Sequence, residues 1–202
     1  MKIIFISILT VLALIMLSCS RSSDSNGNEI VRSDPKKVQI YNEITRLMSL
    51  AGNDNISEED FSSLNSMIGD DDKEKDEINE IKTMVKYKEF GHAAHGLSFL
   101  FEYVGTEKEV LCPGHSLSHY YIFHRHGEYE LAGESLKEAK ENLEDWIPKG
   151  RKYLKEYPNG EKFDDVVNKL NMHLKNIDNG IINITNSDLD YLDDKASICV
   201  EG

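Results

Sequence analysis

The sequence predicts an all-α fold, a bundle of about five to seven mostly antiparallel helices behind a disordered N-terminal tether. Apolar residues recur at intervals of three and four through most of residues 35–177, which is the period of an amphipathic helix. No stretch shows sustained alternation of apolar and polar residues, the pattern expected of a half-buried strand. Short connections between the periodic segments favour antiparallel neighbours.

The first two helices carry clear start and stop signals. Asp34 has the residue type of an N-cap, Pro35 suits the first helical position, and Gly52 suits the end of the helix. Ser57 and Asp60 have the spacing of a capping box, with Asp in place of the usual Glu. They predict a second helix that ends at Gly69.

A long central helix is expected from about residue 76 to residue 104, after an acidic run at residues 70–77. Its apolar side chains, such as Ile81, Val85 and Phe99, occupy most of the circumference. A helix that is apolar on most sides is usually buried. This helix is therefore expected to form the middle of the bundle.

The remaining elements are expected between proline, glycine and turn signals. Pro148 is expected to break the helix that begins at Ser135, and Ser187 is expected to cap the last helix. Residues 105–113 are expected to form a loop and residues 181–184 to be extended. The expected helices cover residues 115–126, 135–147, 153–157, 163–177 and 187–192.

The composition limits the partners of the chain. The 202 residues include 36 acidic and 23 basic side chains and have a formal net charge of -13. Nucleic acid and anionic lipid both attract proteins through Lys and Arg patches, so neither is an expected electrostatic partner. The charge is consistent with a solvated surface.

The N-terminus has the pattern of an export signal. Lys2 precedes an almost purely apolar run of about fifteen residues, which is shorter than the roughly 20 residues of a membrane span. The run ends at Met16-Leu17-Ser18-Cys19, which resembles the lipobox of bacterial lipoproteins, although Met16 stands where that family usually has Leu, Val or Ile. The resemblance implies cleavage before Cys19 and lipidation of Cys19 with palmitate-type acyl chains. An ordinary cleaved signal with an unmodified cysteine is the alternative.

Residues 20–34 are rich in Ser, Asn and Asp and poor in apolar groups, so they are expected to form a flexible tether. The expected organisation is a signal peptide at 1–18, a tether from lipidated Cys19 to residue 34, and one helical domain at 35–202. The lipobox, the tether and the Lys/Asn/Ile-rich body resemble plasmid-encoded surface lipoproteins of spirochaetes (Borrelia type). That resemblance implies anchoring to the outer membrane, exposure at the cell surface, contact with a host protein and no enzymatic activity.

Two cysteines remain if Cys19 carries lipid. Exported proteins meet an oxidising compartment, where two remaining cysteines often pair. The sequence therefore predicts a disulfide between Cys112 and Cys199. This bond would join the C-terminal tail to the loop before the histidine-rich helix.

Six of the seven histidines lie between residues 92 and 126. Helical spacing, and a hairpin centred near residue 108, would bring together His92, His95, His119 and His126. Four imidazoles suit Zn²⁺ or Cu²⁺. A buried, hydrogen-bonded histidine cluster without metal is the competing interpretation, and a haem held by two of these histidines is a further one.

The expected function is that of a non-catalytic, lipid-anchored surface protein that binds a host or neighbouring macromolecule. The second hypothesis is a Zn²⁺- or Cu²⁺-binding lipoprotein that uses the histidine cluster. The chain has no nucleophile elbow, no phosphate-binding glycine loop and no His-Glu-x-x-His string. A catalytic site, nucleic acid and a resident cofactor are therefore not expected under the first hypothesis.

Overall fold

The computed structural model describes residues 35–69, 72–102, 110–153, 161–194 and 199–201. The expected signal peptide, the tether and the lipidation site at Cys19 lie outside these residues. The chain divides after Val38 into two units, and the larger unit, Gln39–Gly202, contains the core and the histidines. The first helix begins just before this boundary, at Pro35, and continues into the larger unit.

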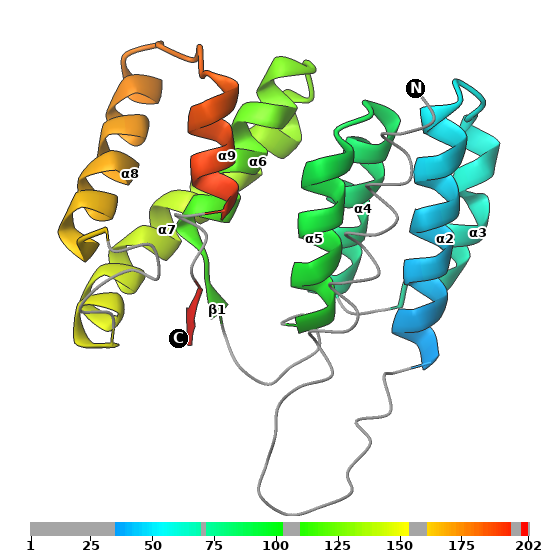
Figure 1. The fold of residues 1–202 in the computed structure, drawn as a ribbon, viewed down its shortest axis with the longest axis horizontal. Helices are drawn as coiled ribbons and strands as arrows, with labels where there is room; N and C mark the ends of the chain where they lie inside the picture. The colour runs from blue at the N-terminus through cyan, green and yellow to red at the C-terminus, as the bar shows by residue number, and fades with distance from the viewer. Residues whose placement is uncertain (1–34, 70–71, 103–109, 154–160, 195–198, 202) are drawn as a thin grey trace, which may run out of the picture. The chain divides into compact units, whose positions relative to one another are not determined.

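Helices dominate the described residues, which confirms the all-α class (Figure 1). A short antiparallel ladder is added to them, in which Leu111 faces Val200 and Val110 faces Glu201. The elements are α2 (Pro35–Gly52), a 3₁₀-helix η1 (Glu58–Phe61), α3 (Ser62–Met67), α4 (Asp72–Lys86), α5 (Phe90–Glu102), β1 (Val110–Leu111), α6 (Pro113–Arg125), α7 (Tyr129–Tyr153), α8 (Phe163–Asp178), α9 (Asn186–Asp194) and β2 (Val200–Glu201).

The first helical signals are confirmed. Helix α2 begins at Pro35 and ends at Gly52, as expected. The backbone N–H of Ser57 donates to Asp60 Oδ2 over 2.8 Å, which is the capping-box contact. The segment after it differs slightly from the expectation, because a 3₁₀ turn precedes the six-residue α3.

The expected long helix from residue 76 to residue 104 is wrong, because the chain forms two helices, α4 and α5. Lys88 adopts a left-handed backbone conformation with φ 62°. Its N–H donates to the carbonyl of Val85, and the N–H of Glu89 donates to the carbonyl of Met84. These are the two hydrogen bonds of a Schellman-type helix end, which normally uses Gly at the left-handed position. The sequence has no Gly or Pro there, so the break leaves no local signal.

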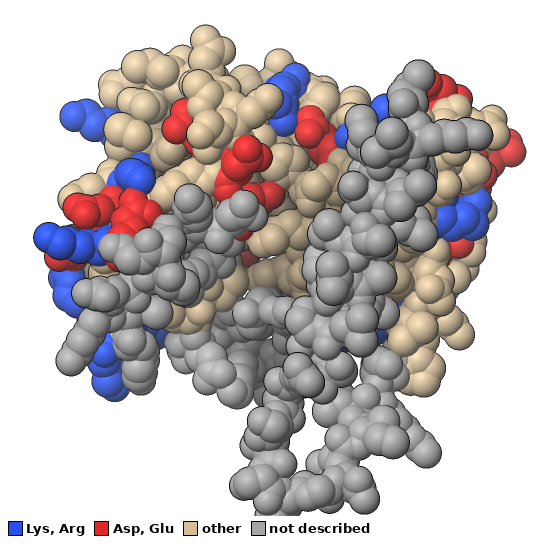
Figure 2. Space-filling view, viewed as in Figure 1, with Lys and Arg blue, Asp and Glu red and all other residues tan. Residues whose placement is uncertain are grey.

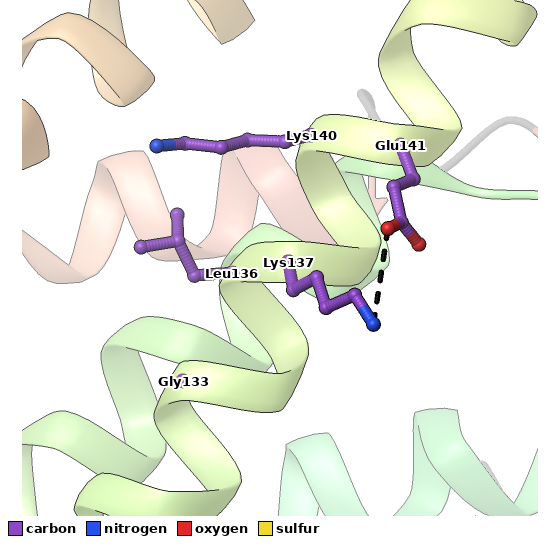
Figure 3. Close-up of a pocket in the computed structure, with 5 residues that line it drawn as sticks. All are labelled: Gly133, Leu136, Lys137, Lys140 and Glu141. Atoms are coloured by element: carbon purple, nitrogen blue, oxygen red, sulfur yellow. Dashed lines mark ion pairs between the residues drawn. The ribbon is translucent and has the colours of Figure 1, made fainter.

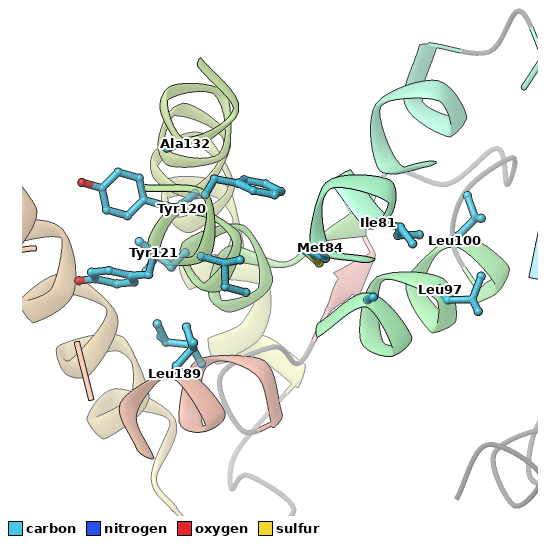
Figure 4. Packing of buried hydrophobic residues seen from close by; sticks show 14 of the residues in the cluster. Ile81, Met84, Leu97, Leu100, Tyr120, Tyr121, Ala132 and Leu189 are labelled. Carbon is cyan, nitrogen blue, oxygen red and sulfur yellow. The ribbon is translucent and has the colours of Figure 1, made fainter. Parts of the chain in front are cut away.

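Packing explains why the chain turns at Lys88. Helix α5 folds back along α4, so Ile81 and Met84 of α4 and Leu97 and Leu100 of α5 are all buried (Figures 1 and 4). The helices approach closely at Gly96, where a Cβ atom would lie only 2.9 Å from the Oε1 atom of Glu77. This burial offsets the roughly 1–2 kcal/mol that a left-handed non-glycine residue costs.

The most enclosed of the described helices is α6, rather than the segment expected from the sequence. Every residue from Pro113 to Phe123 is buried. Helix α7 is its main neighbour, and α9 packs against it as well. In Figure 4, Tyr120 and Tyr121 of α6 are drawn with Ala132 of α7 and Leu189 of α9 in one buried cluster. Helix α6 carries histidines and serines, so its burial also takes polar groups into the core.

The expected break at Pro148 is wrong as well. Helix α7 runs through Pro148 and starts before the expected Ser135. The helix loses one backbone hydrogen bond at the proline, but packing on either side of Pro148 stabilises it. Trp146 is fully buried and its ring stacks 4.8 Å from that of Phe163, while Gly150 leaves room for the same phenyl ring.

The C-terminal elements follow the predicted order with one change of cap. Helix α8 covers the expected segment from Phe163. Thr185, rather than Ser187, caps α9, because its Oγ1 accepts from the N–H of Asp188 over 3.1 Å and donates to the Asp188 carboxylate over 2.6 Å. The reciprocal pair satisfies one of the free N–H groups of the helix start.

The predicted disulfide between Cys112 and Cys199 is present. Cys112 immediately precedes α6, and Cys199 immediately precedes β2. The bond closes a segment with a sequence separation of 87 residues. It therefore fixes the start of the buried helix to the C-terminal end of the chain.

The described surface mixes charges of both signs. On the face drawn in Figure 2, acidic and basic side chains lie next to one another. Ion pairs among the described residues include Lys140 with Asp178, Arg151 with Asp164, and Lys169 with Glu161. Exposed pairs of this kind contribute little to stability. Among the described helices, none combines the length and the apolar character needed to cross a membrane.

Replacing Cys112 and Cys199 together by serine is expected to lower the free energy of unfolding by about 4 kcal/mol, because the open chain regains loop entropy. Urea unfolding followed by circular dichroism measures this difference. Wild-type protein under reducing conditions should show the same loss. Alkylation of both sulfurs in unfolded, unreduced protein, mapped by mass spectrometry, would show that the bond is absent.

Candidate metal centre

Helix α6 brings polar side chains into the core on its buried face. His115 and His119 are four residues apart, so they lie one above the other on the same side of the helix. The two residues are 4% and 2% exposed, and Ser118 between them is fully buried. The disulfide at Cys112 and Pro113 at the first helical position fix where this helix begins.

Asp193 of α9 is the acidic group at the centre of this region. Its side chain is buried and forms a short hydrogen bond with Nδ1 of His92 on α5. The hydroxyl of Ser118 donates to the other carboxylate oxygen, Oδ1, over 2.6 Å. The Nδ1 atom of His95 lies 3.6 Å from the same Oδ1. One carboxylate therefore joins α5, α6 and α9.

The atoms of His95, His115 and Asp193 form the tightest group of potential metal ligands in the described part of the chain. One ligand atom from each residue lies within 4.8 Å of the other two. The Nδ1 atoms of His95 and His115 are 3.1 Å apart. A tetrahedral ion bound at about 2.0–2.1 Å holds its ligand atoms about 3.3–3.4 Å apart. The two separations at His95, 3.1 and 3.6 Å, lie on either side of that distance.

The three residues of this potential metal site differ in their exposure to solvent. The side chain of His95 is 32% exposed, whereas His115 and Asp193 are buried. An ion can therefore reach the group from the side of His95. The ring of Phe99 stacks on His115 with a centroid distance of 4.8 Å and forms an apolar wall. An apolar wall strengthens electrostatic interactions at a site because it excludes water.

Helix α4 contributes two further carboxylates beside His115 and His119 of α6. Glu80 Oε2 lies 2.5 Å from Nδ1 of His119, and Glu77 Oε1 lies 4.0 Å from Nε2 of His115. The imidazole rings of His115 and His119 are 3.9 Å apart between centroids. The ring of Phe123 meets His119 at an edge. The histidines therefore lie between Asp193 on one side and the two glutamates on the other.

Burial and neighbouring charges determine the ionisation of the acidic and basic groups around Asp193. Burial alone would raise the pKa of the Asp193 carboxyl, but its hydrogen bond with His92, the charges of His95 and His92, and the Ser118 hydroxyl hold that pKa well below its usual range. Burial lowers the pKa of His115 well below its usual value, and neighbouring His119 acts in the same direction. The region thus holds a carboxylate beside a neutral imidazole, and these are the forms in which both groups bind metals.

The pKa values of Glu77 and His119, near α4, shift in the opposite direction to those of Asp193 and His115. Burial raises the pKa of Glu77 well above its usual value, and the charge of Glu80 acts in the same direction. Burial would lower the pKa of His119, but the charge and hydrogen bond of Glu80 outweigh it and raise that pKa to about 9. His119 is therefore the positive partner of Glu80, while Glu77 resists ionisation in its buried position.

The structure separates the four histidines that the sequence predicted as ligands. His95 belongs to the three-residue group, and His92 bonds to its carboxylate. His119 turns its Nδ1 towards Glu80 instead. His126 lies elsewhere: its ring stacks on Tyr87 at 4.3 Å and its Nε2 is 2.7 Å from Glu89.

The hairpin register assumed from the sequence explains the difference. That register placed His92 opposite His126, but His92 pairs with Asp193 of α9, and His126 lies against Tyr87 and Glu89. His115 shares a helical stripe with His119, so the sequence contains a signal for it. Asp193 has no comparable signal, because it lies in an acidic segment 74 residues beyond His119 that resembles any solvated helix.

Two other features carry no comparable chemistry. A shallow pocket on α7, lined by Gly133, Leu136, Lys137, Lys140 and Glu141, contains none of the clustered histidines (Figure 3). His173 pairs with the hydroxyl of Tyr121 over 3.1 Å inside the core. Neither feature brings several ligand atoms together.

Comparisons of the chain with protein-family models, with curated proteins and with solved structures found no match.

Replacing Ser118 by alanine is expected to lower the free energy of unfolding by about 1.5–3 kcal/mol at neutral pH, because a buried carboxylate loses a hydrogen bond. Urea unfolding measures the loss. The control is Ser135→Ala, since the buried Ser135 hydroxyl donates to a backbone carbonyl. Ser135→Ala should lower the free energy of unfolding by less than Ser118→Ala does.

The same comparison has a defined pH dependence. The pKa of Asp193 is lowered in the folded protein, so the stability that its carboxylate contributes is present above the ordinary Asp pKa of about 3.9 and is lost as pH falls further. The difference between Ser118→Ala and wild type should therefore shrink in strong acid. A constant difference across this range would contradict the assigned role of the hydroxyl.

Proposed function

We propose that this chain is an exported, lipid-anchored protein that binds a divalent transition-metal ion through His95, His115 and Asp193. The observation that carries this proposal is the convergence of three ligand atoms within 4.8 Å, from three different helices. Two of the distances match the ligand separation of a tetrahedral site. This set replaces the four histidines expected from the sequence.

The ligand types limit the metal. Imidazole nitrogens suit Zn²⁺, Cu²⁺, Ni²⁺ and Fe²⁺, whereas Ca²⁺ and Mg²⁺ prefer sites built from oxygen atoms. Three protein ligands leave a coordination position for water or for another ligand. We take Zn²⁺ and Cu²⁺ as the ions to test, and acquisition or buffering of metal outside the cytoplasm as the role.

The surroundings of the three ligands support this proposal. Ligands in metal sites are usually held by hydrogen bonds from an outer layer of residues. Here His92 and Ser118 both bond to the Asp193 carboxylate. These contacts orient the carboxylate, so little side-chain entropy remains to be lost when an ion binds.

The location is proposed from the sequence. The pattern ending at Cys19 supports lipidation, and residues 20–34 support a flexible tether between the lipid and a helical bundle. Anchoring to the outer membrane at the cell surface belongs to the same proposal. Binding of a host macromolecule and the lack of catalysis stay predictions from the resemblance to surface lipoproteins.

Full-length protein purified without a histidine tag is expected to retain at least one equivalent of Zn²⁺ or Cu²⁺ after loading and desalting. The variant His95→Phe should lose one equivalent, because a ligand has been removed. Elemental analysis measures the content, and circular dichroism checks the fold. The control is His124→Phe, since His124 lies against Tyr129 and outside the cluster. Less than about 0.2 equivalents in wild type would remove the proposal.

Lipidation is tested separately. The wild-type chain, expressed in a bacterium that processes lipoproteins, is expected in the membrane fraction with acyl chains on Cys19, because more than one chain gives stable anchoring. Cys19→Ala should lose the fatty acid and leave that fraction. Mass spectrometry of the N-terminal peptide provides the measurement. Unprocessed, unacylated wild-type protein in the cytosol is the result that rules out the anchor.

A further inference from the structure

Three buried polar atoms of the histidine cluster have no hydrogen-bond partner within the described part of the chain: Oε1 of Glu77, Nε2 of His115 and Nε2 of His119. The three residues are 8%, 4% and 2% exposed. Each buried polar atom without a partner costs about 1–3 kcal/mol. Three such atoms in neighbouring residues indicate that something polar belongs between them.

Glu77 of α4 and the two histidines of α6 are neighbours in the core. Nε2 of His115 is 4.0 Å from Oε1 of Glu77, and the rings of His115 and His119 are 3.9 Å apart. A separation of 4.0 Å is too long for a direct hydrogen bond. It is short enough for both atoms to bind one ion at about 2.0–2.2 Å.

The contact between Glu80 and His119 has the form found at metal sites. A histidine that binds a metal through one ring nitrogen usually donates the N–H of the other nitrogen to a carboxylate. Nδ1 of His119 lies 2.5 Å from the Glu80 carboxylate. The Nε2 atom of His119 is one of the three atoms without a partner. When the His119 ring keeps its Nδ1 proton for Glu80 and gives up its Nε2 proton, Nε2 offers a lone pair to a metal.

His115 connects this region to the three-residue group. Its Nδ1 atom lies 3.1 Å from His95 Nδ1, and its Nε2 atom lies 4.0 Å from Glu77. The two nitrogens of one imidazole therefore face two sets of potential ligands. His119 and Glu77 belong to the second set.

We propose that Glu77, His115 and His119 bind a second divalent transition-metal ion, and that the His115 imidazole bridges this ion to the one at His95 and Asp193. The inference rests on the proposed function for its first ion. Both ring nitrogens of His115 then bind metal. The proton of the neutral His115 ring, the carboxyl proton of Glu77 and the Nε2 proton of His119 are released to solvent.

A buried water molecule is the competing occupant, because it also satisfies polar atoms. The ligand types favour the cation. Glu77 and Glu80 lie one helical turn apart on α4, at 4.0 Å from His115 and 2.5 Å from His119 respectively. Two carboxyl groups beside two imidazoles provide ligand types that a divalent transition metal binds, whereas a water molecule does not need them.

The test uses full-length protein without a histidine tag, loaded with Zn²⁺ and desalted. Wild type is expected to hold two equivalents and Glu77→Gln one, since the amide keeps the shape of the side chain but binds metals poorly. The matched control is Asp76→Asn, an exposed neighbour on α4 that undergoes the same change from a carboxyl to an amide. It should keep both ions.

The bridge has its own spectroscopic readout. Two Cu²⁺ ions joined by one imidazolate couple antiferromagnetically, so the spin measured by electron paramagnetic resonance in Cu²⁺-loaded wild type should be well below the total copper. Glu77→Gln should give a spin equal to its copper content. Two equivalents of copper with uncoupled spins in wild type would overturn the bridge.

The outcomes separate the two proposals. One equivalent in wild type that His95→Phe removes and Glu77→Gln leaves unchanged overturns the second ion and keeps the first. One equivalent that Glu77→Gln removes and His95→Phe leaves unchanged places the ion between α4 and α6 and overturns the first site. Wild type without metal overturns both.

Discussion

The carboxylate of Asp193 is the interaction on which the histidine region depends. It receives a hydrogen bond from Ser118 on α6 and pairs with His92 on α5, so three helices meet at one charged group. A buried carboxylate is stable only when its oxygen atoms have partners. Because those partners come from segments far apart in sequence, the buried charge is stabilised only when the three helices are in place.

The disulfide between Cys112 and Cys199 constrains the same region covalently. Cys112 lies three residues before His115, and Cys199 lies six residues after Asp193. Both ends of the bond are therefore close in sequence to a proposed ligand. A cross-link at this position limits how far α6 and the C-terminal segment can separate, and so preserves the distance between an imidazole and a carboxylate that an ion would bind.

Burial of α6 has both a cost and a use. A helix with two histidines and two serines in the core gives up hydration of polar groups, and three polar atoms in its vicinity have no partner among the described residues. Stability alone would favour apolar residues at such positions. A cluster of polar atoms that is costly in the free protein is instead what a metal site requires, because the ion supplies the missing contacts when it binds.

Local patterns in the chain were enough to predict the helical class, the start of α2, the capping box at Ser57 and the position of α8, since these depend on periodicity and capping. The Cys112–Cys199 pair was predictable too, because few cysteines were available. The turn at Lys88, the continuation of α7 through Pro148 and the recruitment of Asp193 were decided by the folded arrangement. Each of these depends on packing between distant segments: the gain from burying apolar side chains outweighs a local preference, and a carboxylate from the far end of the chain becomes the partner of the histidines.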